Sequence, residues 1–239
     1  MLKSASKISL ILLLTAAILF ALPNAVWASN TSEAFTGYGV GNLAGESGGT
    51  NWSTAWQNVT GAMQTTDTSC DAGDCVKAEG ASDLSADRLI DEDITEGTIT
   101  FKFKVVSIGG GPQIRFGDAD PRFRVIINNA GATDLEATTF GTWSDNTWHT
   151  VDIEFGADGG TSSCLANQAR ARLDGGAYSA CTAYLQAGDV DEWQINYGGT
   201  AGRELWVDTM DIVDDNPPAV AAASYDTAPY NIDLWNNWF

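Results

Sequence analysis

The segment TITFKFKVV, residues 98–106, alternates apolar and polar side chains with a period of two. Ile99 and Phe101 fall on one face of an extended strand, and Lys102 and Lys104 fall on the other. An amphipathic helix would repeat its apolar residues every three or four positions, so this segment predicts a half-buried β-strand.

The same alternation recurs along the chain, between turns rich in glycine, aspartate and proline. We find no convincing long amphipathic helix after residue 28. Many short strands joined by such turns predict an all-β fold, an antiparallel β-sandwich of the jelly-roll kind. The further predicted strands are 113–116, 122–127, 148–155, 169–173, 193–197 and 205–213.

The chain has 239 residues, of which 44% are hydrophobic, and this is enough apolar material for one sandwich or two small domains. It carries 31 acidic and 12 basic side chains, for a net charge of -19. This acidity argues against nucleic acid as a partner, because phosphates would be repelled. It argues equally against docking on anionic lipid.

Residues 1–28 have the pattern of a secretory signal peptide. Lys3 and Lys7 precede an apolar stretch at 8–22, and the small-x-Ala pattern ends at Ala28. The apolar stretch is shorter than the ~20 residues that a membrane-spanning helix needs. We therefore expect cleavage after Ala28 and a secreted or cell-surface protein with no membrane insertion afterwards.

The mature chain divides into an expected sandwich domain, 29–213, and a linker with an aromatic tail, 214–239. The tail contains Trp235 and Trp238. It is either a poorly ordered terminus or a segment that docks on this domain or on a neighbouring subunit. In the last case the tail mediates self-association.

Four cysteines in an exported chain predict two disulfides. Three pairings are open, and pairing of sequence neighbours favours Cys70–Cys75 and Cys164–Cys181. A zinc site is disfavoured because the chain has no CxxC motif and a single histidine.

Three stretches together resemble the concanavalin A-like, laminin-G-like superfamily of jelly rolls. They are WHTVDIE at 148–154, the strand 170–175 that ends in LDG, and LWVDTMDI at 205–212. The stretch 33–43 followed by Trp52 is similar to the opening strand of many secreted jelly rolls. The resemblance implies glycan binding, adhesion, or hydrolase or lyase activity on polysaccharides, and the fold does not choose among them.

Hydrolysis is disfavoured by the sequence. Retaining glucanases of this fold resemble one another in a Glu-x-Asp-x-Glu strand, whose alternation puts the carboxylates on one face. Asp152 and Glu154 share a face here, but Gly156 stands at the next alternate position.

A lyase would need a group that neutralises a uronate and a base for the C5 proton. Gln113, His149 and Tyr197 suggest such a set. However, Gln113-Ile-Arg115 departs from the Q-I-H motif of alginate-type lyases, and alternation directs His149 toward the core.

Seven of the ten basic residues after the signal segment lie at polar positions of predicted strands. If those strands share a sheet, a basic stripe crosses an acidic protein and favours an anionic glycan. The alternative is cross-strand ion pairing with Asp152, Glu154 and Asp208. The seven residues are Lys102, Lys104, Arg115, Arg122, Arg124, Arg170 and Arg172, and Gln113 lies among them.

Trp52, Trp56 and Trp143 lie near predicted loops and are candidates for stacking on sugar rings, although most tryptophans in a sandwich pack in its core or rim.

Carboxylates are the ligands that Ca²⁺ prefers, and a structural Ca²⁺ is expected. Asp118 and Asp120 share a turn, and Asp208 and Asp211 lie on the last strand, expected beside Glu33.

The sequence therefore favours a secreted, non-catalytic glycan-binding or adhesion domain, with an acidic polysaccharide as the candidate ligand. A structural extracellular or filament subunit and a jelly-roll polysaccharide lyase or glycoside hydrolase are the alternatives.

We predict that the secreted protein begins at Ser29 and contains no free thiol, because the signal peptide is removed and all cysteines are paired. Mass spectrometry of the secreted protein, with and without alkylation, measures both. A free Cys70 or Cys164 would contradict the disulfide assignment.

Overall fold

The computed structural model of the chain describes residues 30–80, 83–107, 111–117, 121–156, 164–197 and 203–215. The described residues form β-strands and no helix, so no helix among them is long and apolar enough to cross a membrane. The signal segment, most of the tail, and Asp118 and Asp120 lie outside the described residues.

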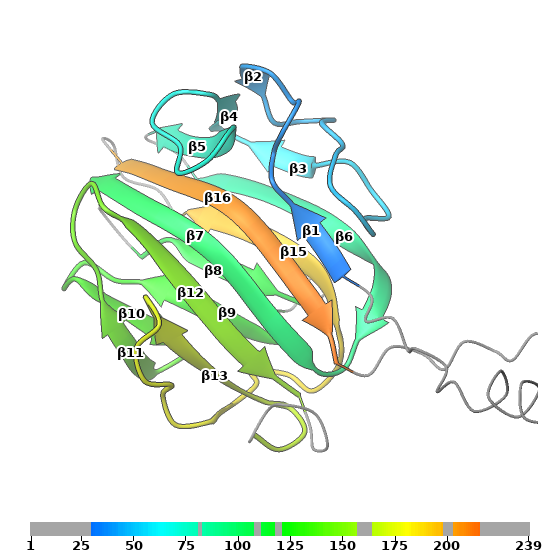
Figure 1. Cartoon of the computed structure of the whole chain (residues 1–239), viewed down its shortest axis with the longest axis vertical. Helices are drawn as coiled ribbons and strands as arrows, with labels where there is room; N and C mark the ends of the chain where they lie inside the picture. Colours follow the sequence, from blue (N-terminus) through cyan, green and yellow to red (C-terminus); the bar gives the residue numbers. More distant parts are fainter. Residues whose placement is uncertain are drawn as a thin grey trace, which may run out of the picture. The chain divides into compact units, whose positions relative to one another are not determined.

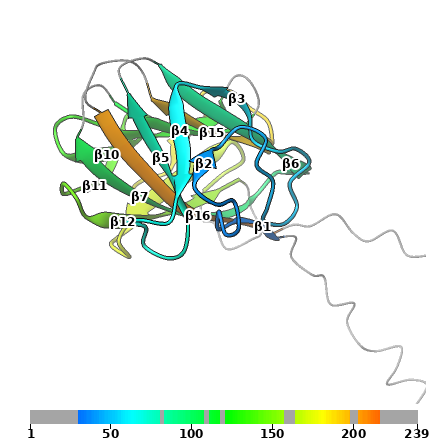
Figure 2. The ribbon, with the colours of Figure 1, turned by 90° about the horizontal axis from the view of Figure 1, so that it is seen from above.

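The strands form two antiparallel sheets, which Figures 1 and 2 show as two layers. The nine-stranded sheet has the order β14 (Thr182–Ala183), β13 (Gln168–Leu173), β12 (Trp148–Phe155), β7 (Gly97–Ser107), β16 (Arg203–Asp214), β5 (Cys75–Gly80), β4 (Ala62–Thr66) and β2 (Gly41–Asn42), with β1 (Asn30–Glu33) also paired to β16. The seven-stranded sheet has the order β11 (Thr138–Thr142), β10 (Ala132–Leu135), β9 (Phe123–Ile127), β8 (Gln113–Phe116), β15 (Val190–Tyr197), β6 (Leu84–Ile94) and β3 (Gln57–Thr60). The predicted all-β, antiparallel sandwich is confirmed.

The core lies between the sheets and is built by the alternation read from the sequence. Ile99 and Phe101 of β7 are completely buried, whereas Lys102 between the buried positions faces outward. Phe101 meets Phe116 of the opposite sheet, with ring centroids 6.0 Å apart. Such aromatic contacts across the layers join the two sheets into one hydrophobic core.

A β-bulge changes the alternation of β16. The register with β7 shifts between Asp208 and Met210, where Thr209 has a φ of 44°. Because of this extra residue, Met210 and Ile212 face the core, and Asp208 and Asp211 both avoid its apolar side. The bulge therefore re-aims the side chains of the last strand.

Both predicted disulfides are present. Cys70 is bonded to Cys75, and Cys164 to Cys181, so the described cysteines include no free thiol. Each bond closes a short loop beside a strand. The cross-link stabilises the fold mainly because it lowers the conformational entropy of the unfolded chain.

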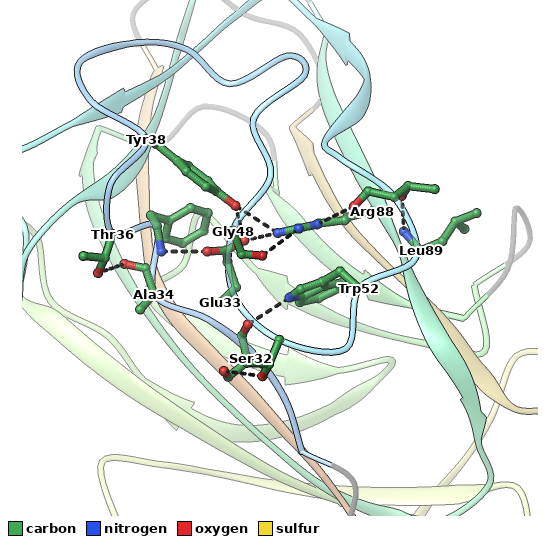
Figure 3. A network of polar contacts seen from close by, with 12 residues as sticks. Ser32, Glu33, Ala34, Thr36, Tyr38, Gly48, Trp52, Arg88 and Leu89 are labelled. Carbon is green, nitrogen blue, oxygen red and sulfur yellow. Dashed lines mark hydrogen bonds and ion pairs between the residues drawn. The ribbon is translucent and has the colours of Figure 1, made fainter.

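A buried ion pair crosses the interior and joins the sheets (Figure 3). Glu33 ends β1 of the nine-stranded sheet, and Arg88 lies on β6 of the seven-stranded sheet. The two side chains are 1% and 2% exposed and form a direct ion pair. Tyr38 donates to Glu33, and burial together with this bond raises the pKa of Tyr38 well above its ordinary value.

The remaining polar atoms of the pair are also satisfied. Arg88 donates to the carbonyl of Thr54 at 2.9 Å and to that of Gly48 at 2.8 Å, and its guanidinium lies 4.7 Å from the Trp52 ring. Glu33 accepts a bond of 2.7 Å from the backbone NH of Phe35. Because the charged groups of this buried pair have hydrogen-bond partners, the pair can hold the loop between β1 and β3 to the sandwich.

We predict that Arg88→Met lowers the free energy of unfolding by about 3–5 kcal/mol, because it leaves the Glu33 carboxylate buried without a partner. Urea unfolding followed by tryptophan fluorescence measures the loss. Adding Glu33→Leu to Arg88→Met should recover part of the stability, since no charge then remains buried.

The control variant is Lys102→Ala, which breaks a partly exposed ion pair with Asp71 and should change stability by less than about 1 kcal/mol. Equal losses for Arg88→Met and Lys102→Ala would show that the buried pair contributes no more to stability than the partly exposed one.

Candidate functional site

The seven basic residues expected to form one stripe are divided between the two sheets. Lys102 and Lys104 lie on β7, and Arg170 and Arg172 on β13, all in the nine-stranded sheet. Arg115 and Arg124 lie on β8 and β9 of the seven-stranded sheet, and Arg122 immediately precedes β9. Because the outward faces of the two sheets of a sandwich point in opposite directions, the expected continuous stripe does not form.

On the nine-stranded sheet the arginines form the cross-strand ion pairs that were the alternative interpretation. Arg170 pairs with Glu154 at 2.6 Å and Arg172 with Asp152 at 2.8 Å, each directly opposite its partner in the register. Both guanidinium groups also lie 4.6 Å from the ring of Tyr178. Burial and the neighbouring Glu154 raise the pKa of Tyr178 to about 12. These arginines are neutralised by the protein itself.

Lys104 is enclosed rather than presented to a ligand. It is 7% exposed, and its ammonium lies 4.8 Å from the Trp148 ring and 4.3 Å from the Trp206 ring. It donates to the carbonyl of Ser69 at 2.6 Å. Burial lowers the pKa of Lys104.

The loop closed by Cys70–Cys75 lies against this same surface. Asp208 accepts bonds of 3.0 Å from the backbone NH groups of Asp71 and Ala72, and Lys102 forms an ion pair with Asp71. The loop thus covers part of the nine-stranded sheet and engages Lys102 and Asp208, while Ser69, immediately before the loop, engages Lys104.

The outward side of the seven-stranded sheet carries a grid of polar side chains, which we call the polar face. Its first row joins Gln113 of β8, Asn196 of β15 and Ser85 of β6. Its second row joins Arg115, Gln194 and Asp87 on the same three strands. The apolar residues that alternate with them, such as Ile114 and Ile195, are completely buried, so the six polar side chains share the outer side.

Arg115 is the cation of the polar face. It lies directly opposite Arg124, which is paired with Glu136 at 3.0 Å. Gln113 accepts a bond of 2.9 Å from Nε of Arg115, and no ion pair joins Arg115 to a described carboxylate. Burial and the charge of Arg124 lower the pKa of Arg115.

Two carboxylates border the middle of the polar face. Asp87 is 7% exposed and accepts a bond of 3.1 Å from the amide of Asn58. Glu192, which precedes Gln194 by two residues on β15, accepts a bond of 2.9 Å from the Gln194 amide. Amides, a guanidinium and carboxylates on one surface can donate to and accept from neutral hydroxyl groups.

The three tryptophans proposed for stacking lie elsewhere. Trp56 is 1% exposed and packs in the core, with its ring centroid 5.0 Å from that of Trp193. The prediction that Trp56 stacks on a sugar ring is therefore wrong. Trp143 is 9% exposed and donates to the carbonyl of Asn128. Trp52 packs on Arg88 and donates to the carbonyl of Ser32.

The residues of the expected lyase set are not assembled. His149 is buried, with Nδ1 2.7 Å from Asp174 and Nε2 accepting from the NH of Ser144. Tyr197 is buried and donates to the carbonyl of Ser107. Only Gln113 of the three lies on the polar face.

The acids expected to bind Ca²⁺ do not form one site among the described residues. Glu33 is committed to Arg88, and Asp208 to the loop closed by Cys70–Cys75, while Asp211 is exposed. No group of three or more His, Cys, Asp or Glu side chains in the described ranges is placed to hold a metal. The described residues therefore do not fit the ion, and no role is assigned to it.

The residues that the sequence reading missed are Ser85, Asp87, Glu192, Gln194 and Asn196. A signal was present, because Glu192, Gln194 and Asn196 alternate with the buried Trp193 and Ile195. Only the register with β8 and β6 connects them to Gln113 and Arg115.

Comparison with solved structures identifies the fold. A Crh5 transglycosylase in complex with NAG is 14% identical, with a TM-score of 0.51 over 80% of this chain and 86% of that one. The PL-14 alginate lyase from Aplysia kurodai is 8% identical, with a TM-score of 0.47 over 66% and 90%. The carbohydrate-binding module CBM66 from Bacillus subtilis is 13% identical, with a TM-score of 0.42 over 64% and 91%.

The chain thus has the concanavalin A-like jelly-roll fold that the sequence motifs predicted. No protein-family model matches the chain, and no curated protein matches it in sequence.

We predict that Arg115→Ala changes the free energy of unfolding by less than about 1 kcal/mol, because Arg115 opposes a like charge and has no described carboxylate partner. Arg170→Ala should lose about 1–2 kcal/mol, because it leaves the mostly buried Glu154 unpaired. Urea unfolding of the two variants gives the comparison. A larger loss for Arg115→Ala would make Arg115 a structural residue.

Proposed function

We propose that this protein is a carbohydrate-binding domain and that its polar face is the surface that binds glycan. The observation that carries the proposal is the two-row grid of amide, guanidinium, hydroxyl and carboxylate groups on β8, β15 and β6. Planar amides and guanidinium groups can each make two parallel hydrogen bonds, which suits the paired hydroxyls of a sugar ring. The fold, which is shared with a transglycosylase, is compatible with this role.

The orientation of the grid supports binding rather than stability. Its side chains point away from the core, and no hydrogen bond joins the Asn196 side chain to another described residue. The bond from Arg115 to Gln113 orients the guanidinium without neutralising its charge. Groups held in place but left with unused hydrogen-bonding capacity are what a specific polar site requires.

An extracellular location is part of the proposal. Two disulfides in one small domain are typical of oxidising compartments, and extracellular glycans are met there.

Glycoside hydrolysis is the second candidate, and one observation favours it. Asp87 and Glu192 lie on neighbouring strands of the polar face, diagonal to each other across the Gln194–Asp87 pair. Retaining and inverting hydrolases both need two carboxylates on one surface. Against this, Glu192 is 6% exposed and bonded to Gln194, and Gln194 and Asn196 carry amides instead of carboxyl groups.

We predict that Arg115→Ala and Asn196→Ala each weaken glycan binding by about fivefold or more, because each removes hydrogen-bonding groups from the polar face. Calorimetry against alginate, pectate, sulfated galactan and neutral glucan measures the affinities. Arg172→Ala, on the opposite sheet, is the matched control and should bind like the wild type.

An equal loss for Arg172→Ala, or no loss for Asn196→Ala, would remove the polar face as the binding surface. If the protein instead releases reducing ends from the same polysaccharides, and Glu192→Gln abolishes this release, the protein is a glycoside hydrolase.

A further inference from the structure

The second row of the polar face changes its charge from one end to the other. Arg115 on β8 is followed by the neutral amide of Gln194 on β15 and then by the carboxylate of Asp87 on β6. We infer that the face takes a glycan in which an acidic sugar is followed by a neutral one, with the acidic group at Arg115 and the neutral sugar over Gln194 and Asp87. This inference rests on the proposed function and adds the class of ligand and its direction.

The Arg115 end is suited to a carboxylate or sulfate. Gln113 engages Nε of Arg115, so the two terminal nitrogens of the guanidinium remain for an anion. The opposing Arg124 is already paired with Glu136, whereas Arg115 has no described carboxylate within ion-pair distance. Glu136 offsets part of the charge of Arg115, and an anionic group placed here would supply further counter-charge and reduce the repulsion between the two arginines.

The Asp87 end is suited to hydroxyl groups and opposes a second anion. Two strand spacings separate β8 from β6, so the backbone positions of Arg115 and Asp87 are about 10 Å apart. Asp87 is mostly buried, and its described side-chain partner is the uncharged amide of Asn58. A hydroxyl can donate to this carboxylate, whereas a uronate carboxylate would meet a like charge that Asn58 does not neutralise.

Glu192 does not add to this discrimination. It lies two residues before Gln194 on β15, diagonal both to Arg115 of β8 and to Asp87 of β6. A chain with an anion on every sugar would place one anion at Arg115 and the next against Asp87. A chain whose acidic sugars alternate with neutral ones avoids that repulsion.

Calorimetry with three oligosaccharide probes of equal length tests the inference. The probes are a hyaluronan fragment, in which uronate alternates with a neutral sugar, a mannuronate fragment with a carboxylate on every sugar, and a neutral laminarin fragment. Wild-type protein should bind the hyaluronan fragment about three- to fivefold more tightly than either of the others. Higher salt should reduce this preference, because exposed charges are screened.

Asp87→Asn keeps the shape of the side chain and its bond to Asn58 while removing the charge. It should narrow the preference for the hyaluronan fragment over the mannuronate fragment by about three- to fivefold, because the charge that repels the second carboxylate is removed. Arg115→Gln should abolish the preference for hyaluronan over laminarin. Asp152→Asn, which removes a carboxylate from the opposite sheet, is the matched control and should alter neither ratio.

The outcomes separate the two proposals. If none of the three fragments binds, the proposed function fails with the inference. If wild type binds the mannuronate fragment as tightly as the hyaluronan fragment, or Asp87→Asn leaves their ratio unchanged, the inference is overturned while the carbohydrate-binding function stands. The wild-type ratio provides this test even if a variant does not fold.

Discussion

The ion pair between Glu33 and Arg88 is the constraint that organises this sandwich. A charged pair inside an apolar core is tolerated only when every donor and acceptor around it is satisfied. That requirement draws the hydroxyl of Tyr38 and the carbonyls of Gly48 and Thr54 to one point. The long connection between β1 and β3, which has little regular structure, is thereby fixed against β6.

The same ion pair sets the direction of the neighbouring side chains. Arg88 points into the core, so alternation along β6 turns Asp87 to the outer surface of the sheet. Asp87 then shares its row with Gln194 and Arg115. The interaction that stabilises the interior therefore also places the acidic end of the polar face.

The two outer surfaces of the sandwich differ in how far their charged side chains are paired within the protein. On the nine-stranded sheet, charges are consumed by cross-strand pairs and by the loop closed by Cys70–Cys75. On the seven-stranded sheet, Arg115 forms no ion pair with a described carboxylate, and the amides of β8 and β15 can still form further hydrogen bonds. The proposed preference for a sparsely charged ligand rests on this difference and on the net charge of -19.

By itself, the sequence determined the class of fold and most of the core, and it favoured the disulfide pairing that the structure has. Alternation is a local property, so the burial of Ile99, Phe101 and Ile153 follows from spacing, and the pairing of Cys70 with Cys75 follows from short loops. Alternation tells only whether a side chain faces the core. It cannot tell which sheet a strand joins, which strand lies beside it, or where a bulge such as that at Thr209 shifts the register. Those long-range choices separated Arg115 from Arg172, gave Arg172 the partner Asp152, and brought Asp87, Gln194 and Arg115 into one row, because packing of the whole core decides which strands become neighbours.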